Sequence, residues 1–282
     1  MMYIDDAVML QPYPDDPYVT PDTAALPISS FFPNLSFYIR MGAILKKAAN
    51  IAESGNYTSD KWVTSSIDIR AALEKCGVRF TVEGFDNFKH MDAPCVFIGN
   101  HMSTLETFVL PGLIRPFRPV TFVIKESLMR YPVFRHVMRS RDPIVVERRD
   151  PRADFAAVME GGARNLEKGI SVIVFPQSTR RPALDRRHFN SMGVKLARKA
   201  GVPIVPVALR SDAWGMGGLF GLLKDHGPIR PQIPVHFRFG SPLAVEGSGK
   251  AEHDRVYSFI ENCLAEWGIE PGKTGSQPAP GA

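Results

Sequence analysis

The chain has 282 residues, of which 44% are hydrophobic and 22% are charged. This balance is typical of a globular protein and excludes a disordered or fibrous one. The length predicts one large domain, or one domain with a small helical addition. The formal net charge is +5, but residues 111–200 contain 19 Lys and Arg against 8 Asp and Glu. A basic middle favours partners that carry phosphate, such as nucleic acid, phospholipid headgroups or phosphorylated cofactors.

Several classes of protein are disfavoured by what the sequence lacks. The longest uncharged stretch, residues 23–39, is shorter than a membrane span and contains Pro27 and Pro33. The first residues do not resemble a secretory signal, so the cytoplasm is the expected compartment. Three cysteines lie far apart without a CxxC pair, which predicts reduced thiols rather than a disulfide framework or a zinc site.

The N-terminal quarter divides into an extended lead-in and two helices. Residues 1–30 are rich in Pro and Asp without periodicity and are predicted to be an extended lead-in. In residues 31–77, a helical segment, the apolar residues from Leu35 to Ala48 recur at helical spacing beside Arg40, Lys46 and Lys47. This pattern fits equally a helix packed on its own domain and an anchor on a membrane surface. A second helix over residues 60–76 is predicted to end before Gly77.

From residue 78 to 267, short apolar runs alternate with helical stretches, which predicts an α/β domain. Strands are expected at 78–82, 95–98, 120–124, 144–146, 170–175, 204–209 and 235–239. Helices are expected near 103–113, 126–139, 151–168, 190–200 and 252–267. The predicted fold is therefore a mixed, largely parallel sheet flanked by helices and preceded by an N-terminal helical pair. Residues 268–282 are predicted to be a disordered tail.

The segment 95–108 carries the most informative constellation. A buried strand is followed by His101 in a turn, and Glu106 lies five residues later, one turn into a helix predicted to start at Ser103. A carboxylate that fixes the tautomer of an imidazole and stabilises its cation makes the imidazole a better general base. The alternative is a helix cap alone, because Ser103 and Glu106 also match the S-x-x-E capping box.

Polar groups follow three further strands. Lys125 follows residues 120–124, Glu147 and Arg148 follow 144–146, and residues 177–180 follow the strand that ends at Phe175. Ligands of open α/β sheets bind outside the carboxyl ends of the strands, so we expect these groups to converge with His101. Each cation taken alone is typical of a solvated surface. Together they indicate a phosphorylated alcohol as the substrate.

These residues make the sequence similar to the glycerolipid acyltransferases, the PlsC-like family that esterifies glycerol phosphate, lysophosphatidate and other lysophospholipids. The four blocks that carry the resemblance are residues 100–106 (Asn-His-x-Ser-x-x-Glu), 146–148 (Val-Glu-Arg), 175–180 (Phe-Pro-Gln-Ser-Thr-Arg) and 202–207 (Val-Pro-Ile-Val-Pro-Val). Lys125 and Leu128 resemble a Lys-x-x-Leu stretch between the first two blocks. The resemblance extends over residues 78–243.

The resemblance implies transfer of a fatty acyl group from acyl-CoA or acyl carrier protein to a hydroxyl of a lysophospholipid or glycerol phosphate. It implies His101 as the general base and Glu106 as its orienting partner, with Arg148 on the acceptor phosphate. The other implied substrate-binding residues are Asn100, Ser103, Lys125, Glu147, Gln177, Ser178, Thr179, Arg180 and Pro206. No cofactor and no metal site are expected, since the thioester is a co-substrate and the histidines lack ligand spacing.

Two departures from the family pattern concern the carboxylate and the third block. Glu106 stands where Asp is usual, which keeps the charge and adds one methylene. Gln177 and Ser178 stand where Glu and Gly are usual, which removes a charge and a flexible backbone position.

The location implied by the resemblance is the cytoplasmic face of a membrane, with peripheral attachment. A catalytically weak lipid-binding or membrane-tethering protein on the same fold is the alternative, and the intact His101 and Glu106 argue against it. A nucleic-acid partner is not expected, because the sequence has no helix-turn-helix, zinc-finger or RNA-recognition signature.

Overall fold

The computed structural model describes residues 13, 15–130, 134–217 and 227–269. The strands are β1 Tyr18–Val19, β2 Phe80–Glu83, β3 Val96–Gly99, β4 Val120–Lys125, β5 Ile144–Val146, β6 Ser171–Val174, β7 Ile204–Arg210 and β8 Val235–Phe239. The α-helices are α1 Pro27–Phe31, α2 Pro33–Glu53, α3 Ser59–Lys75, α4 Leu105–Ile114, α5 Phe134–Arg139, α6 Pro151–Glu167, α7 Met192–Ala200 and α8 Lys250–Glu266. Short 3₁₀ helices occur at Asp22–Ala24, Phe85–Asn87, Glu126–Arg130 and Arg186–His188.

The strands form one sheet in the order β1-β2-β8-β7-β3-β6-β4-β5. The β1–β2 and β7–β8 pairs are antiparallel and the other pairs are parallel. The predicted mixed, largely parallel sheet is confirmed. The four strands β3, β4, β5 and β6 run in one direction, so their carboxyl ends share one edge.

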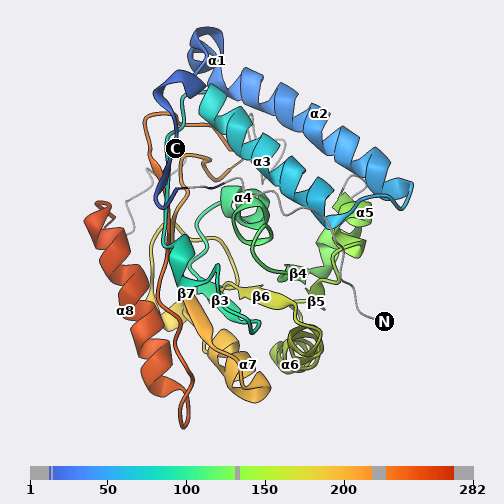
Figure 1. Cartoon of the computed structure of the whole chain (residues 1–282), viewed down its shortest axis with the longest axis vertical. Coiled ribbons are helices and arrows are strands. Elements are labelled where there is room, and N and C mark those ends of the chain that lie inside the picture. The colour runs from blue at the N-terminus through green and yellow to red at the C-terminus, as the bar shows by residue number, and fades with distance from the viewer. Residues whose placement is uncertain (1–12, 14, 131–133, 218–226, 270–282) are drawn as a thin grey trace, which may run out of the picture.

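Helices cover both faces of the sheet (Figure 1). Helices α2, α3 and α4 lie on one side, and α6, α7 and α8 lie on the other. Along β3, Phe97 packs into the first layer while Val96 and Ile98 pack into the second. Strands that are buried on both faces read as continuous apolar runs, which is why the sequence predicted them well.

Local sequence explains where several helices begin and end. The side chain of Asp150 accepts a hydrogen bond from the backbone N–H of Arg152 at 2.8 Å, and Pro151 occupies the first turn of α6. Helix α3 ends as predicted before Gly77, whose φ of +92° favours glycine. The predicted helix over 126–139 is instead a 3₁₀ helix and the short α5, separated by residues 131–133, which lie outside the described part of the chain.

The N-terminal lead-in differs from an unpaired extended chain. Its described part includes β1, which pairs with β2, and α1. Tyr13 is buried and stacks on Phe85 with ring centroids 5.0 Å apart, while Thr20 and Tyr18 donate hydrogen bonds to the buried Glu74. From residue 270 onward, the predicted tail lies outside the described part of the chain.

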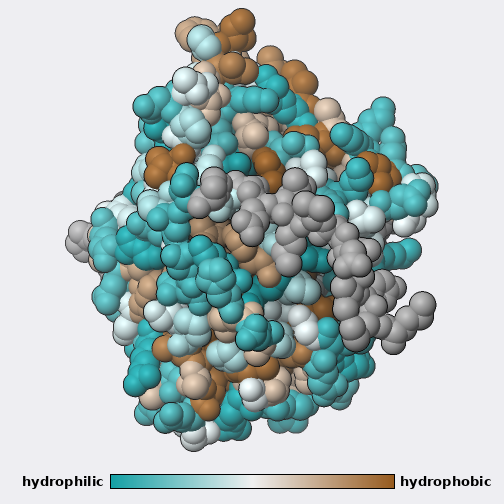
Figure 2. Space-filling model, in the orientation of Figure 1, coloured by the Kyte–Doolittle hydropathy of each residue, from teal (hydrophilic) through white to brown (hydrophobic). Residues whose placement is uncertain are grey.

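The face of α2 that packs on the domain is the one whose periodicity the sequence shows. Met41 and Ala48 are buried, and Tyr38 and Leu45 pack against the same core. A second apolar stripe is exposed across α1 and α2: Ile28, Phe31, Phe32, Leu35 and Ile39. Figure 2 shows hydrophobic surface where α1 and the start of α2 lie. Every member of the predicted stripe except Leu35 packs against the domain. None of the helices in the described ranges combines the length and apolar character that a membrane span requires.

Candidate active site

His101 and Glu106 form a hydrogen-bonded pair at the carboxyl end of β3. The strand ends at Gly99, and His101 lies in the turn before α4. Its Nδ1 is 2.9 Å from Oε1 of Glu106, and its ring stacks on Phe175 with centroids 4.4 Å apart. Because Nδ1 is engaged by the carboxylate, Nε2 is the ring nitrogen that can accept a proton.

The Glu106 carboxylate is fully buried and surrounded by donors. The backbone N–H groups of Met102 and Ser103 donate to Oε1 at 2.6 and 2.9 Å, and the hydroxyl of Ser211 donates to Oε2 at 2.5 Å. Burial alone raises the pKa of Glu106, but the hydrogen bonds from His101, Ser211 and the Ser103 backbone outweigh it and hold this pKa below its ordinary value. Glu106 is therefore an anion, suited to stabilise an imidazolium.

The capping interpretation is partly right and does not compete with the pair. Glu106 does accept from the Ser103 backbone N–H, as a capping box requires. However, α4 begins at Leu105 rather than Ser103, and the Ser103 hydroxyl accepts from the N–H of Leu105 at 3.0 Å. The same carboxylate thus closes the helix terminus and orients His101, so the two roles coexist.

Ser211 is a site residue that the sequence analysis missed. It follows β7 directly, is fully buried, and bonds both Glu106 and the hydroxyl of Ser103, the latter at 3.0 Å. The rule that located the other polar groups, a polar residue just after a strand, would have found it.

Asn100 ties β3 to β7 rather than facing a ligand. Its side-chain amide donates to the carbonyl of Leu209 at 2.7 Å and accepts from the N–H of the same residue at 2.8 Å. Asn100 is almost fully buried. These bonds complete the ladder between the two strands one residue beyond β3.

A cavity of about 1000 Å³ opens beside His101. Its polar end is lined by five cations, Lys125, Arg148, Arg149, Arg180 and Lys195, and by Thr104, Ser178, Thr179 and Asp154. The first four follow the strands β4, β5 and β6, and Lys195 lies on α7. The structure therefore brings the predicted Lys125, Arg148, Ser178, Thr179 and Arg180 together with His101.

Backbone contacts hold the arginines of this end in place. The carboxylate of Asp154, in the first turn of α6, accepts from the N–H groups of Glu147 and Arg148 at 2.9 and 3.0 Å. Arg148 takes a φ of +61° there. The guanidinium of Arg180 donates to the hydroxyl of Thr104.

The charges of this end influence one another. Partial burial lowers the pKa of Arg148, Asp154 opposes that shift, and the nearby charge of Arg180 adds to it. Arginine nonetheless remains protonated at neutral pH. Two guanidinium groups that repel each other form a site ready for an anion such as phosphate.

The third block contributes both cavity lining and support. The buried Gln177 accepts from the backbone N–H of His101 at 2.6 Å and donates to the carbonyl of Ala183 at 3.3 Å. Ser178 lines the cavity with a φ of +59°, a conformation that the usual glycine adopts without strain. Gln177 thus supports the turn that presents His101.

Five residues predicted to bind substrate lie outside the cavity lining: Asn100, Ser103, Glu147, Gln177 and Pro206. Four are buried, and Glu147 is exposed. Pro206 is inside β7, paired with Ile98. Asn100, Ser103 and Gln177 support the site through the hydrogen bonds described above.

The opposite end of the cavity is apolar. Its lining comes from α2, α3, β4 and α5 and includes Met41, Ile44, Leu45, Trp62, Ile69, Phe122, Val137 and Met138. The sequence predicted these elements but not that they enclose a space. No cluster of His, Cys, Asp or Glu suited to a metal ion is found in the ranges that the structure describes.

Comparisons with known proteins identify the family of this chain. The acyltransferase family model matches residues 79–210. A curated 1-acyl-sn-glycerol-3-phosphate acyltransferase of Pseudomonas aeruginosa is 35% identical over 194 residues, 67% of this chain and 70% of that protein. The chloroplastic enzyme BAT2 of Brassica napus is 30% identical over 60% of this chain and 48% of its own length.

A solved structure shares the fold. The crystal structure of the 1-acyl-sn-glycerophosphate acyltransferase PlsC from Thermotoga maritima matches with a TM-score of 0.60 and 20% identity, over 87% of this chain and 99% of that one. The sequence matches and the fold together place this chain in the PlsC-like acyltransferase family. It is an O-acyltransferase of phospholipid synthesis.

Proposed function

We propose that this chain transfers a fatty acyl group from a thioester, acyl-CoA or acyl carrier protein, to the free hydroxyl of a 1-acylglycerol 3-phosphate. The observation that carries the proposal is the cavity that joins His101, a cationic end and an apolar end. The names of the relatives support a glycerol phosphate acceptor.

In this mechanism, Nε2 of His101 takes the proton of the acceptor hydroxyl while the oxygen attacks the thioester carbonyl carbon. Glu106 stabilises the imidazolium through Nδ1. Collapse of the tetrahedral intermediate breaks the carbon–sulfur bond, and the thiolate recovers the proton from Nε2. The products are an ester and a free thiol.

Arg148 and Arg180 bind the acceptor phosphate, with Lys125 beside them. Their charge-assisted hydrogen bonds to phosphate are stronger than neutral ones. The apolar end takes an acyl chain, since each buried methylene contributes about 0.8 kcal/mol.

The decisive experiment is acyl transfer by the purified protein from a radiolabelled acyl thioester to a panel of lysolipids, beside His101→Ala. We expect the variant to fold and to lose about 10²-fold to 10⁴-fold in turnover. A folded His101→Ala protein with near-normal turnover would overturn the mechanism. Binding of lysolipid without turnover by the unaltered protein would favour the tethering alternative.

We also propose peripheral attachment to a membrane through the exposed stripe of α1 and α2. Ile28 and Phe31 are 79% and 78% exposed, and Leu35 and Ile39 continue the same face. Lys46 and Lys47, at the far end of α2, are exposed and add attraction for anionic lipid. Membrane attachment would bring the cavity to its lipid substrates.

Flotation with anionic vesicles tests the anchor. Ile28→Ser combined with Phe31→Ser is expected to reduce flotation strongly, while Val19→Ser, an exposed residue outside these helices, leaves it unchanged. Equal flotation of the double variant and the unaltered chain would show that the stripe is not the anchor.

A further inference from the structure

A second concave site lies between α6 and α7, on the side of the sheet opposite α2 and α3. It is a groove of about 530 Å³, lined from α6 by Phe155, Ala156, Met159 and Glu160 and from α7 by Lys195, Arg198 and Lys199. Phe155 and Lys195 also line the cavity of His101. The groove therefore adjoins the cavity of His101 at these two side chains.

The α7 side of the groove is cationic. Lys195, Arg198 and Lys199 stand at i, i+3 and i+4 and so share one helix face. All three are exposed, and none forms an ion pair with an acidic side chain of the described residues. The guanidinium of Arg198 donates a hydrogen bond to the carbonyl of Gly247 at 3.4 Å. Cations held side by side without acidic partners favour an anionic ligand.

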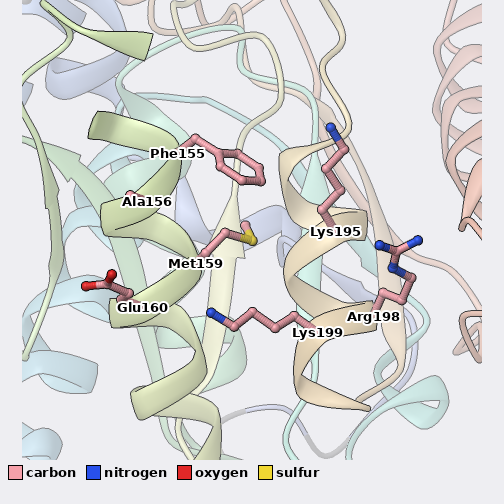
Figure 3. A pocket seen from close by; sticks show the side chains of 7 residues that line it. All are labelled: Phe155, Ala156, Met159, Glu160, Lys195, Arg198 and Lys199. Atoms are coloured by element: carbon pink, nitrogen blue, oxygen red, sulfur yellow. The ribbon is translucent and has the colours of Figure 1, made fainter. Parts of the chain in front are cut away.

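The α6 side supplies an apolar floor. Figure 3 shows Phe155 and Met159 pointing from α6 toward α7, Lys199 reaching back toward α6, and the Glu160 carboxylate pointing away from α7. The ring of Phe155 is 38% exposed, and Nζ of Lys195 lies 5.4 Å from its centroid. An exposed aromatic ring beside cations suits a flat, electron-rich base that carries phosphates.

We propose that this groove binds the phosphorylated nucleotide end of an acyl-CoA donor. The inference rests on the proposed acyl transfer and assigns its donor. The adenine stacks on Phe155, and the 3′-phosphate and pyrophosphate pair with Arg198 and Lys199. The pantetheine arm then passes Lys195 into the catalytic cavity, which brings the thioester to His101.

The shape of the site favours a nucleotide over an acidic carrier protein. Lys199 reaches across a concave space with an apolar floor, which accepts a planar ring, while the guanidinium of Arg198 lies at the outer edge of this space (Figure 3). A folded protein partner uses a broad, convex-to-flat surface of larger area. Arg186 and Arg187, the exposed cations that precede α7, are already paired with Asp254 and Asp185.

The test compares two donors that differ only in the nucleotide. For Arg198→Gln combined with Lys199→Gln, we measure KM and kcat with oleoyl-CoA and with S-oleoyl-pantetheine. Glutamine keeps part of each stem, and both residues lie outside the lining of the catalytic cavity. The matched control is Lys61→Gln with Arg255→Gln, two exposed cations on α3 and α8.

We expect the groove variant to raise KM for oleoyl-CoA about tenfold, because each exposed cation–phosphate pair contributes a few-fold in affinity. Its kcat, and its KM for S-oleoyl-pantetheine, should stay within about twofold of the unaltered protein. Calorimetry with adenosine 3′,5′-bisphosphate should show a similar loss of affinity. The control should match the unaltered protein in all three measurements.

Three results would overturn the proposal. One is an unchanged KM for oleoyl-CoA, and the second is an equal rise with both donors. The third is transfer only from acyl carrier protein with a KM that the groove variant raises, which would assign the groove to an acidic protein. Absence of transfer from every thioester would instead contradict the proposed acyltransfer, while binding of the bisphosphate would still report on the groove.

Discussion

Replacing Glu106 by Gln removes the buried charge while keeping the size and shape of the side chain. The Gln oxygen can keep the bonds from Nδ1 of His101 and from the Met102 and Ser103 backbone, while its NH₂ group meets the hydroxyl of Ser211, which can turn to accept. Charge-assisted hydrogen bonds are roughly twice as strong as neutral ones. We therefore expect the imidazolium to lose about 2 kcal/mol of stabilisation, or about 30-fold in turnover.

The loss should be smaller than that of His101→Ala, and Glu106→Asp should keep much more activity because the charge remains. Initial rates with saturating thioester and lysophosphatidate measure the effect. Glu246→Gln, an exposed carboxylate on the loop before α8, serves as the control and should stay within about twofold. Turnover of a folded Glu106→Gln protein within twofold of the unaltered chain would refute the assignment of Glu106.

The same substitution has a signature in stability against pH. Because the pKa of Glu106 in the folded chain lies below its ordinary value of 4.5, the folded state binds fewer protons there than the unfolded state. The carboxylate thus contributes stability above about pH 4.5 that is lost as pH falls through the folded pKa. The gap in unfolding free energy between the unaltered chain and Glu106→Gln should narrow from pH 7 to pH 3.5, and a gap that widens would contradict this.

Three further substitutions test the supporting residues. Ser211→Ala removes one hydrogen-bond donor from Glu106. It should raise the activation free energy by about 1 kcal/mol and so lower kcat several-fold, with KM for the acceptor unchanged. An equal change in KM would indicate a role in binding. Ser178→Gly removes the backbone strain that the positive φ imposes on serine, and should raise the free energy of unfolding by about 1 kcal/mol in urea titrations. A loss of stability would show that the serine is not strained at this position. Gln177→Glu puts a carboxylate oxygen next to the carbonyl oxygen of Ala183. This change should lower the free energy of unfolding by about 1–3 kcal/mol without changing the ranking of lysolipid headgroups. A changed ranking would indicate that Gln177 contributes to substrate binding.

The central strands β3, β4, β6 and β7 were predictable because they are largely buried on both faces. Of the eight strands in the described residues, seven were predicted, and the one that was missed, β1, is two residues long. It is held by Thr20, whose hydroxyl accepts from the N–H of Phe80, and by the buried Glu74. Such long-range polar contacts leave no periodic signal in the chain.

The site was predictable where it follows the ends of parallel strands and not where it depends on the direction of side chains. Lys125, Arg148 and Arg180 reach the cavity as the order of strands implies. Gln177 belongs to the same strand end but turns under His101, and no sequence pattern distinguishes it from its neighbours. The exposed stripe of α1 and α2 was missed for a related reason, since α2 has apolar residues on two faces and the pattern does not indicate which face packs.

The fourth sequence block supports the pair of His101 and Glu106, and none of its residues lines the cavity. β7 lies beside β3 in parallel register, with Val207 opposite Gly99. One residue beyond that pair, the side chain of Asn100 forms hydrogen bonds with the backbone N–H and C=O of Leu209. Ser211, two residues after Leu209 and just past the end of β7, donates its hydroxyl to Glu106. The position of His101 is therefore set by β7 as well as by its own turn. β7, none of whose residues lines the cavity, thus helps to fix the positions of His101 and Glu106, because buried hydrogen bonds link it to both neighbouring segments.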